Sequence, residues 1–462
     1  MIKKIYRTLF ALIIFFFILI IYLSTIGIKT DKFNSKIISQ VKKIEPNLEL
    51  KLSKVSATLN PFKLKINAIT IGADLIYKDK VIELESIKSD ISLKSFINGD
   101  FAITGIFIST KSLAIKDFIA FARLFYNDPK LYIAKQFIKK GYLIGDLKLE
   151  FDEVGNIKSN YNFTGLVRDG KVNLFKKYNF SKIDFIFEIN KKNIIFNDIK
   201  LFINNNDILL PEFIITKQNN DYSISGIINT NNTSLDKNDI KNFINDQFLK
   251  PSIEDILFSS KNNFKFKIDN KFKIKNLDIK SVIDLDNLKL KNSLKLKDFF
   301  PEIRKNIIFK DHKIKFVYKK DNLSIDGEGK VFLQNKVDKI NYKIYKIKND
   351  FKFNTILNIS NNSFKIDLLN YKKIEDTDIK LSFKGKSKIN GKLIFDLISL
   401  KEKNNIISIK DLIISKKNRI NDMGNININY TDKYNLKNNL QIKKRSKDYL
   451  ISGDSFNLDN II

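Results

Sequence analysis

Apolar and polar residues alternate along most of the 462-residue chain, so that each run has one apolar and one polar side. A period of two is typical of a β-strand with one buried and one solvated face. Clusters of Asn, Asp, Gly and Lys separate the runs, and proline is scarce, because a sheet uses most backbone N–H groups as hydrogen-bond donors. From Gly141 onward we expect almost continuous strand, with interruptions near 236–258 and 297–307.

The clearest alternation is NFKFKIDNKFKIK at 263–275, where apolar side chains occupy even positions only. Runs near 288–296, 351–353, 364–368 and 379–383 repeat the pattern. Residues of one parity share a face of a strand, so these runs predict one extended apolar surface. The candidate residues for this surface are Phe264, Phe266, Ile268, Phe272, Ile274, Leu288, Leu290, Leu294, Leu296, Phe351 and Phe353.

A sheet with one apolar side must cover that side, and a second sheet, helices or closure into a barrel are the ordinary ways to do so. The predicted helices are too few to cover so many strands. Open sheets of this size curl or split. We therefore expect a mainly β fold in which an elongated, curled, one-sided antiparallel sheet, with a few short capping helices, packs against itself or holds an equally apolar ligand.

The uncharged stretch LFALIIFFFILIIYLSTIGI at 9–28 is long enough to cross a hydrocarbon core of about 30 Å. Lys3, Lys4 and Arg7 precede it, which predicts a cytoplasmic N-terminus by the positive-inside rule. A cleavable signal peptide would have a shorter apolar core followed by an Ala-x-Ala site, and this segment has neither. We expect a retained single-pass anchor in a bacterial inner membrane, with the rest of the chain on the far side.

Helical periodicity occurs in two further places. Phe33, Ile37, Ile38 and Val41 form one face of a short helix predicted over 31–45. Residues 117–140 carry two apolar stripes separated at Asp128-Pro129, which predicts two helices because proline starts a helix well and interrupts one badly. Such a pair either caps the end of a sheet, which we favour, or lies on a membrane surface.

The stretch ISLKSFINGDFAITGIFIST at 91–110 predicts two strands joined by a turn at 98–100. Upstream, LKIN at 64–67 and ITIG at 69–72 alternate in opposite phase. A change of phase within one run predicts a β-bulge between them.

The formal charge of +31 is compatible with a partner that is a polyanion. Only six of the 82 basic residues are Arg, the side chain that supplies the commonest specific base contacts, and the Lys residues are spread evenly between apolar positions. This distribution is typical of an AT-rich genome and argues against a nucleic-acid-binding surface. Weak attraction to anionic lipid headgroups is compatible with it.

The sequence contains no recognisable catalytic or metal-binding motif. Cysteine is absent, which excludes thiol nucleophiles, disulfides and Cys-based metal sites. The only histidine, His312, is interpreted as a solvated turn residue, and GEGK at 327–330 lacks the spacing of a phosphate-binding loop, so we interpret its glycines as strand residues in a curved sheet. We expect no enzyme activity, no cofactor and no metal.

The N-terminal 200 residues resemble the opening of the AsmA-like family, which includes AsmA, TamB and YhdP. After the anchor and short helix, VSATLNPFKLKINAITIG at 55–72 is similar to the family's strand-Pro-strand-Gly segment, and 91–103 to its hairpin, with Phe96 in place of the usual Leu. Residues 132–201 resemble the YhdP-type branch in their succession of helix, Gly and aromatic-rich strands. The remaining residues share the texture of alternating strands.

The resemblance implies an inner-membrane anchor bearing a long groove-shaped sheet in the periplasm, in which phospholipid acyl chains travel toward the outer membrane. It divides the chain into an anchor at 1–29, an AsmA-like β segment at 30–140 and groove repeats at 141–462. Long members of the family extend much further, so the chain is either a shorter homologue that works with an outer-membrane or periplasmic protein partner, or one segment of a longer protein.

Two functions compete with lipid transport. The first is an outer-membrane protein assembly factor or scaffold, which pairs its sheet edge with strands of another protein. The second is an adhesin-like solenoid, whose apolar faces pack fully against each other and leave a dry core. An apolar face that is open to a ligand favours lipid transport, whereas one that is fully packed against other side chains favours the solenoid.

Overall fold

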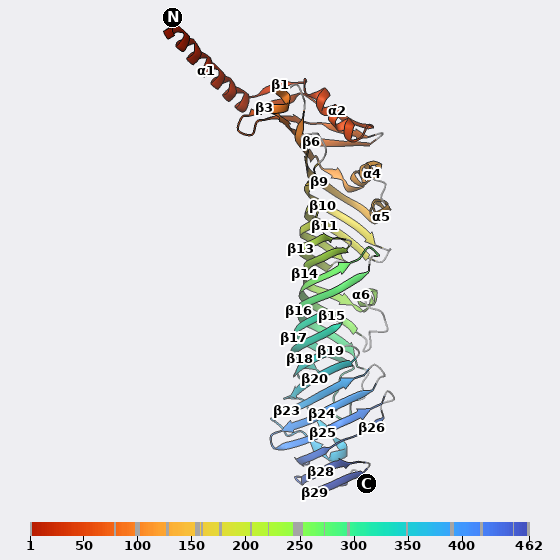
Figure 1. Ribbon diagram of the computed structural model, residues 1–462. Coiled ribbons are helices and arrows are strands. Elements are labelled where there is room, and N and C mark those ends of the chain that lie inside the picture. The colour runs from red at the N-terminus through yellow and green to blue at the C-terminus, as the bar shows by residue number, and fades with distance from the viewer. Residues whose placement is uncertain are drawn as a thin grey trace. The chain divides into compact units, whose positions relative to one another are not determined.

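The computed structural model describes most of the chain, and its strands dominate Figure 1. Among the described residues, 27 strands belong to one antiparallel sheet and two more form a small ribbon. The sheet is not closed into a barrel, and the predicted mainly β, antiparallel fold with few helices is confirmed. The described residues are 2–77, 80–97, 102–125, 129–152, 158, 160–174, 178–203, 206–219, 221–243, 253–271, 273–292, 296–347, 350–388, 392–415, 419–446 and 448–459.

The chain divides into two compact units. Unit 1 comprises residues 1–205 and 209–222, and unit 2 comprises residues 206–208 and 223–462. The boundary expected at 140/141 falls near the start of strand β9 (Ile138–Glu150), which pairs with a strand on each side.

Unit 1 begins with helix α1 (Ile2–Thr25), which is long and apolar enough to cross a membrane and has no buried residue. Its other helices are α2 (Asn34–Ile44), α3 (Leu93–Ile97), α4 (Ile115–Phe125) and α5 (Pro129–Phe137). Its strands, besides β9, are β1 (Ile28–Thr30), β2 (Leu48–Lys51), β3 (Val55–Asn60), β4 (Lys65–Ile71), β5 (Asp74–Tyr77), β6 (Lys80–Ser92), β7 (Ile103–Thr110), β8 (Leu113–Ala114), β10 (Asn162–Leu174), β11 (Tyr178–Asn190) and β12 (Asn193–Ile203). Strand β13 (Asn206–Gln218) contributes its last ten residues to this unit.

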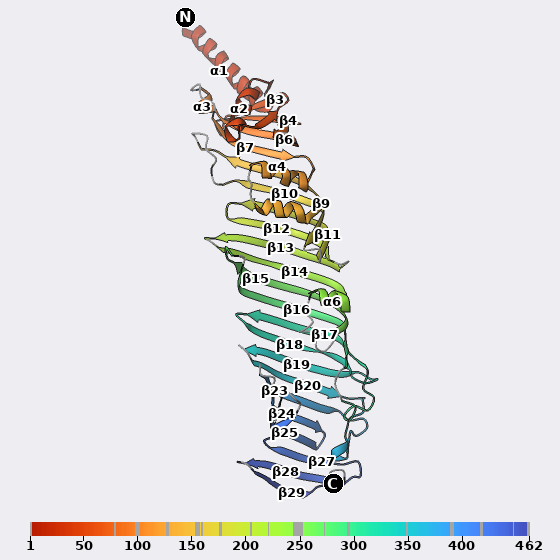
Figure 2. The ribbon, with the colours of Figure 1, turned by 90° about the vertical axis from the view of Figure 1, so that its right-hand side faces the viewer.

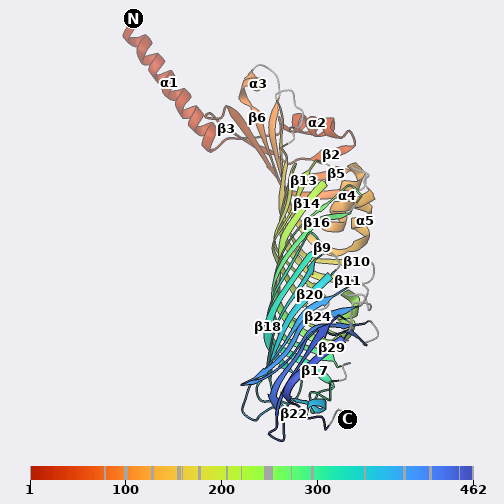
Figure 3. The same cartoon turned by 60° about the horizontal axis from the view of Figure 1, so that its bottom comes forward.

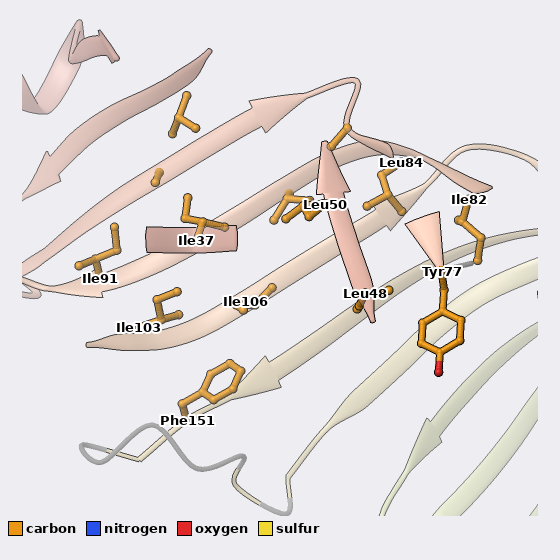
Figure 4. Packing of buried hydrophobic residues seen from close by; sticks show 14 of the residues in the cluster. Ile37, Leu48, Leu50, Tyr77, Ile82, Leu84, Ile91, Ile103, Ile106 and Phe151 are labelled. Atoms are coloured by element: carbon orange, nitrogen blue, oxygen red, sulfur yellow. The ribbon is translucent and has the colours of Figure 1, made fainter. Parts of the chain in front are cut away.

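The main core of unit 1 lies beneath helix α2 (Figure 4). Ile37 of the helix is buried among strand residues that include Leu84 and Ile91, and Phe33, Ile38 and Val41 pack at the edge of the same cluster. The predicted apolar face of this short helix is therefore confirmed. Because a helix with a matching stripe covers these strands, the core is filled with side chains from both layers.

Strands β6 and β7 form the predicted hairpin, with Ile91 opposite Ile103 and Ile87 opposite Ile108. The short helix α3 follows β6 directly (Figure 3), whereas the predicted turn at 98–100 lies outside the described residues. The predicted bulge in β4 is wrong, because β4 pairs with β3 and β6 in unbroken register. Ala68 and Thr70 are buried, and Ile71 instead faces outward.

Residues 117–140 contain the two predicted helices, α4 and α5, although the second ends at Phe137. Helix α4 packs on the face of the sheet, where Phe118 stacks on Phe163 of β10 with ring centroids 5.9 Å apart. A second, smaller core of unit 1 forms there around Leu143, Val167 and Phe187.

Unit 2 consists of successive antiparallel strands, seen side by side from β16 to β20 in Figure 2. Among the described residues of this unit, helix α6 (Lys237–Phe243) and the 3-10 turn η2 (Asp367–Leu369) interrupt them. The strands are β14 (Asp221–Asp236), β15 (Ile253–Ile268), β16 (Ile274–Lys291), β17 (Asn306–Lys319), β18 (Asn322–Phe332), β19 (Asp338–Ile347), β20 (Asp350–Ile359), β21 (Lys365–Ile366), β22 (Tyr371–Lys372), β23 (Ile379–Ser387), β24 (Leu393–Glu402), β25 (Asn405–Ile414), β26 (Ile420–Asp422), β27 (Ile426–Thr431), β28 (Lys437–Arg445) and β29 (Asp448–Ser455).

Asp or Asn residues with positive φ stand inside several long strands. Asp311 in β17, for example, has φ 53° and lies where the register with β18 shifts. Asp169 in β10 and Asp198 in β12 mark similar register shifts in unit 1. Such bulges bend a strand and increase its twist, so they give each unit a physical source of sheet curvature.

Candidate functional site

One face of the unit 2 sheet is apolar from β16 to β29, and we call it the apolar face. Its side chains form two rows that run across the strands, and within a row each residue lies directly opposite the next. One row runs from Ile340 in β19 to Leu440 in β28. The longer row beside it consists of Ile283, Ile314, Gly327, Tyr342, Thr355, Phe383, Ile398, Ile409, Ile426, Ile442 and Ile451.

The described candidates that belong to strands lie on this same side, whereas Leu296 lies in the turn that covers it. In the β15–β16 hairpin, Phe264 is opposite Ile279 and Ile256 is opposite Leu288. Candidates near both ends of this hairpin therefore lie on one face of the sheet. Phe353 is opposite Ile344, which the ladder connects to Phe316 and Ser281. Ile274, near the end of its hairpin, and Phe351 are exposed. Phe272 and Leu294 lie outside the described residues.

A cavity of about 740 Å³ lies against the apolar face, and we call it the lid cavity. Its lining is apolar except for Thr355 and Ser399. Ligand pockets are typically about 300–1,000 Å³ and mainly apolar, so the cavity has the size and chemistry of a hydrocarbon-binding site. Its lining includes Ile307, Phe309, Val331, Leu357, Phe364, Leu381, Phe383, Leu400, Ile407, Ile426 and Ile428.

Of the candidate residues from the sequence, only Leu296 lines the lid cavity. Leu381, Phe383 and Ile428 belong to alternating runs, but alternation alone does not distinguish a cavity wall from the rest of an apolar face. Residues 364–368, expected to be a strand of the sheet, form β21 and η2 instead. They belong to the segment between β20 and β23, residues 360–378, which we call the lid.

The lid and the turn at 296–304 form the other wall of the cavity. Phe300 of the turn meets Phe364 of the lid edge to face, with centroids 5.3 Å apart. The Lys365 backbone N–H donates a hydrogen bond of 3.1 Å to the Phe299 carbonyl. Two short segments therefore cover the strands here, and they leave space that a full helix or second sheet would fill.

A buried carboxylate, Glu402, holds one end of the lid. Tyr371 Oη donates to its Oε2 at 2.7 Å, and Thr377 Oγ1 and the Ile374 backbone N–H donate to its Oε1 at 2.5 and 2.8 Å. Burial, and then the hydrogen bond to Glu402, raises the pKa of the Tyr371 hydroxyl. A fully hydrogen-bonded buried carboxylate fixes three positions of the lid at once.

A second polar cluster holds the other end of the lid. Asn362 Nδ2 donates to Asp338 Oδ2 at 2.8 Å and to the Lys336 carbonyl at 2.7 Å, while Gln334 Nε2 donates to the Ser363 carbonyl at 2.7 Å. Burial raises the pKa of Asp338 to about 6, although the hydrogen bond from Asn362 acts in the opposite direction. The lid is thus attached at both ends by buried polar contacts.

His312 is buried, with 1% of its surface exposed, so its interpretation as a solvated turn residue is wrong. The bulge at Asp311 shifts the parity of β17, which puts His312 on the same face as Phe309. Its Nε2 lies 2.9 Å from the Lys330 carbonyl, and burial lowers its pKa. A side chain on Gly329 would collide with the imidazole at 2.3 Å, and one on Gly327 with the Tyr342 ring at 2.4 Å. Both GEGK glycines are therefore strand residues that make room for a neighbouring ring.

Unit 1 has a cavity of its own, of about 770 Å³, which we call the anchor cavity. It lies at the end of helix α1, where Leu23 meets residues of β1, β3 and β4. Its lining differs from that of the lid cavity because it includes two lysines. The lining residues are Leu23, Ile28, Lys29, Thr30, Lys32, Phe33, Ala57, Thr58, Leu59, Ile66 and Leu93.

The described residues contain no group of three or more His, Cys, Asp or Glu side chains arranged to hold a metal ion. Several exposed carboxylates pair with lysines, as Asp326 does with Lys343 at 3.0 Å. Comparisons of the chain with models of protein families, with curated proteins and with solved structures find no match. Inference about function therefore rests on the geometry of the apolar face and the two cavities.

Proposed function

We propose that this chain is an AsmA-like, membrane-anchored bridge that carries phospholipids along the apolar face of its sheet toward an outer membrane. The observation that carries the proposal is the continuous, largely apolar row from Ile283 to Ile451, with a cavity of about 740 Å³ against it. Burying an acyl chain there stabilises it by about 0.8 kcal/mol per CH₂ group. The cavity offers almost no polar partner, so a headgroup stays outside it.

Helix α1 supports the membrane part of the proposal, because its length and composition suit a single bilayer crossing. Lys3, Lys4 and Arg7 favour a cytoplasmic N-terminus. The sheet would then lie in the periplasm of a cell with two membranes. The transport step needs no catalytic group, because a lipid that slides along an apolar surface breaks no covalent bond.

Site-specific photo-cross-linking tests the proposal. A photoreactive phenylalanine analogue replaces Phe266 on the apolar face or Phe383 in the lid cavity, and cells are irradiated before the protein is purified and analysed by mass spectrometry. We expect phospholipid adducts at both positions. Matched controls at Lys265 and Lys384, exposed neighbours on the opposite face, are expected to yield no lipid.

Equal lipid capture at Phe383 and Lys384 would contradict a lipid-binding groove, since only nonspecific lipid association would label both faces of the strand equally. Capture of protein alone at both apolar positions would contradict lipid transport. A transfer assay completes the test: the purified chain should accelerate movement of a fluorescent phospholipid between donor and acceptor vesicles.

The alternative function, assembly of outer-membrane strands, is favoured by one observation. Strand β29 pairs with β28 alone among the described strands, and all its residues are exposed. Exposed edges pair readily with strands of other proteins. Cross-links from Tyr449 and Ile451 to a β-barrel protein, without lipid at Phe383, would support the alternative over lipid transport.

A further inference from the structure

Three large apolar side chains are strongly exposed to solvent at one end of the unit 1 sheet. Phe62 has 98% of its surface exposed, Ile97 74% and Leu64 61%. Phe62 and Leu64 belong to the turn between β3 and β4, and Ile97 ends helix α3. We call residues 61–64 together with α3 the tip. Large apolar residues at such exposure are usual at surfaces that meet a partner or a membrane.

The tip is a built structure and not a loose loop. Lys63 N–H donates to Asn60 Oδ1 at 3.0 Å, and Leu93 N–H donates to the Leu64 carbonyl at 2.9 Å, which ties the turn to α3. Leu64 has φ 50°, a conformation in which a bulky residue is uncommon and glycine or asparagine is favoured. The turn therefore holds a leucine outward at a conformational cost.

The tip adjoins the anchor cavity, which is also where helix α1 ends. Leu59 and Ile66, which flank the turn, and Leu93, which begins α3, line that cavity together with Leu23 of α1. Ile28, just after α1, pairs with Ala57 of β3. The exposed apolar residues and the apolar helix therefore meet around one cavity.

The charge around the tip is positive. Residues 26–33, 60–66 and 92–97 contain five lysines and a single acidic residue, Asp31. Lys65 pairs with Asp90 at 3.2 Å, whereas Lys29, Lys32, Lys63 and Lys94 are exposed. Apolar side chains surrounded by lysines match the boundary between acyl chains and anionic headgroups, since the apolar groups insert and the ammonium groups remain at the phosphates.

We propose that the tip is a second membrane contact, in which Phe62, Leu64 and Ile97 insert into the leaflet that α1 leaves and the four exposed lysines bind its anionic headgroups. The inference rests on the proposed membrane crossing of α1. Two contacts hold the anchor cavity against the bilayer surface, where a single helix would leave unit 1 free to swing. The partner that the tip binds is an anionic lipid surface, not a protein.

Because the chain contains no cysteine, a single introduced cysteine can be labelled specifically. Phe62→Cys, Ile97→Cys, Ile71→Cys and Ile14→Cys variants of the full chain are labelled with an environment-sensitive fluorophore and reconstituted into phosphatidylcholine vesicles with or without phosphatidylglycerol. Lipids that carry a quencher report contact. Ile71 is the matched control, because it is 73% exposed at the far end of β4. Ile14 reports the crossing of α1 itself.

We expect quenching at Phe62 and Ile97 at least about twofold greater than at Ile71, because insertion buries the labels near the acyl chains. Adding Lys63→Glu and Lys94→Glu to the Phe62→Cys variant should reduce quenching by about threefold in vesicles that contain phosphatidylglycerol and leave it unchanged in phosphatidylcholine alone.

Quenching at Ile14 but not above the Ile71 level at Phe62 would overturn the tip contact and leave the anchor intact. Loss of quenching at Ile14 as well would overturn the anchor and the tip contact together. Because all tip substitutions replace exposed side chains, unchanged thermal unfolding of each labelled variant verifies that the fold is retained.

Discussion

Units 1 and 2 cover their apolar strand faces in different ways. In unit 1, helix α2 presents an apolar stripe to the strands and buries residues such as Ile91 completely. In unit 2, the lid and the turn at 296–304 cover the face only in part, and a cavity of about 740 Å³ remains. The same alternating sequence pattern thus produces a core filled beneath a helix in unit 1 and, beneath the lid of unit 2, a buried core that also holds a cavity.

The two units also differ in the polar side chains that they bury. The lid is held by buried carboxylates, Glu402 and Asp338. The buried polar side chains described in the main core of unit 1 carry hydroxyls instead, those of Tyr77, Thr70 and Ser89. Polar attachment is specific in geometry but adds less net free energy than apolar packing. Phe364 and Tyr371 of the lid also pack in the apolar cluster beneath it. We expect the lid to open before the strands come apart, as the proposed binding and release of a lipid would require.

The largest effect is expected from Glu402→Ala, which would leave the Tyr371 hydroxyl and the Ile374 N–H of the lid without their acceptor, while Thr377 Oγ1 retains the Ile374 carbonyl at 2.9 Å. We expect a loss of about 3–5 kcal/mol, because breaking a buried charged network costs this much. Thermal unfolding measures the loss, and faster tryptic cleavage at Lys365 and Lys373 shows whether the lid opens first. Glu83→Ala, whose partner Lys111 is exposed, is the control and should cost about 0–1 kcal/mol. Uniform cleavage across unit 2 would contradict a separately detachable lid.

The second effect compares one core deletion in each unit. Ile91→Ala in the filled core should cost about 2–5 kcal/mol, because it removes apolar contact and leaves a new cavity. Leu381→Ala, in the wall of the lid cavity, should cost about half as much, since it enlarges a space that already exists. Urea unfolding of both variants in the same detergent provides the comparison. Equal losses would mean that the lid cavity is filled in solution.

Sequence patterns predicted the strands, helix α2 and the pair of helices α4 and α5, because period and face are local properties. They did not predict the parity shift at Asp311, since an aspartate after Lys310 is typical of a turn as well as of a bulge. His312 was misinterpreted for this reason. In β4, Ile69 and Ile71 suggested a bulge, but tertiary pairing keeps the strand regular and leaves Ile71 exposed.

The lid cavity was beyond sequence reasoning for a different reason. Phe364 and Ile366 alternate like strand residues, yet they belong to a lid, because hydrogen bonds to distant groups such as Glu402 fix the segment across the sheet. Which apolar residues line a space depends on such long-range contacts. Leu296 was the one candidate that combined an apolar position with a place in a covering segment.

The third prediction concerns pH. Burial raises the pKa of Asp338 to about 6, above its value of about 3.9 in an unfolded chain. The folded state then binds the extra proton, so this stabilisation is complete below about pH 4 and disappears as pH rises through 6. We expect unit 2 to lose about 1 kcal/mol between pH 5 and pH 8 from this group. Asp338→Asn should abolish that part of the pH dependence, measured by thermal unfolding; an unchanged profile would contradict burial of the carboxyl.

The prediction that is sharpest in sign comes from adding volume to each unit. Thr355→Ile extends a side chain into the lid cavity and should stabilise the protein by up to about 1 kcal/mol, because new contacts form in existing space. Ala68→Ile adds volume to the filled core of unit 1 and should cost about 1–3 kcal/mol. Thermal unfolding of both variants tests the pair, with lipid capture at Phe383 as a second measurement. If the lid cavity holds acyl chains, Thr355→Ile must reduce capture while it raises stability, since the isoleucine and the lipid compete for the same space; reduced stability would mean that the cavity is already occupied or closed.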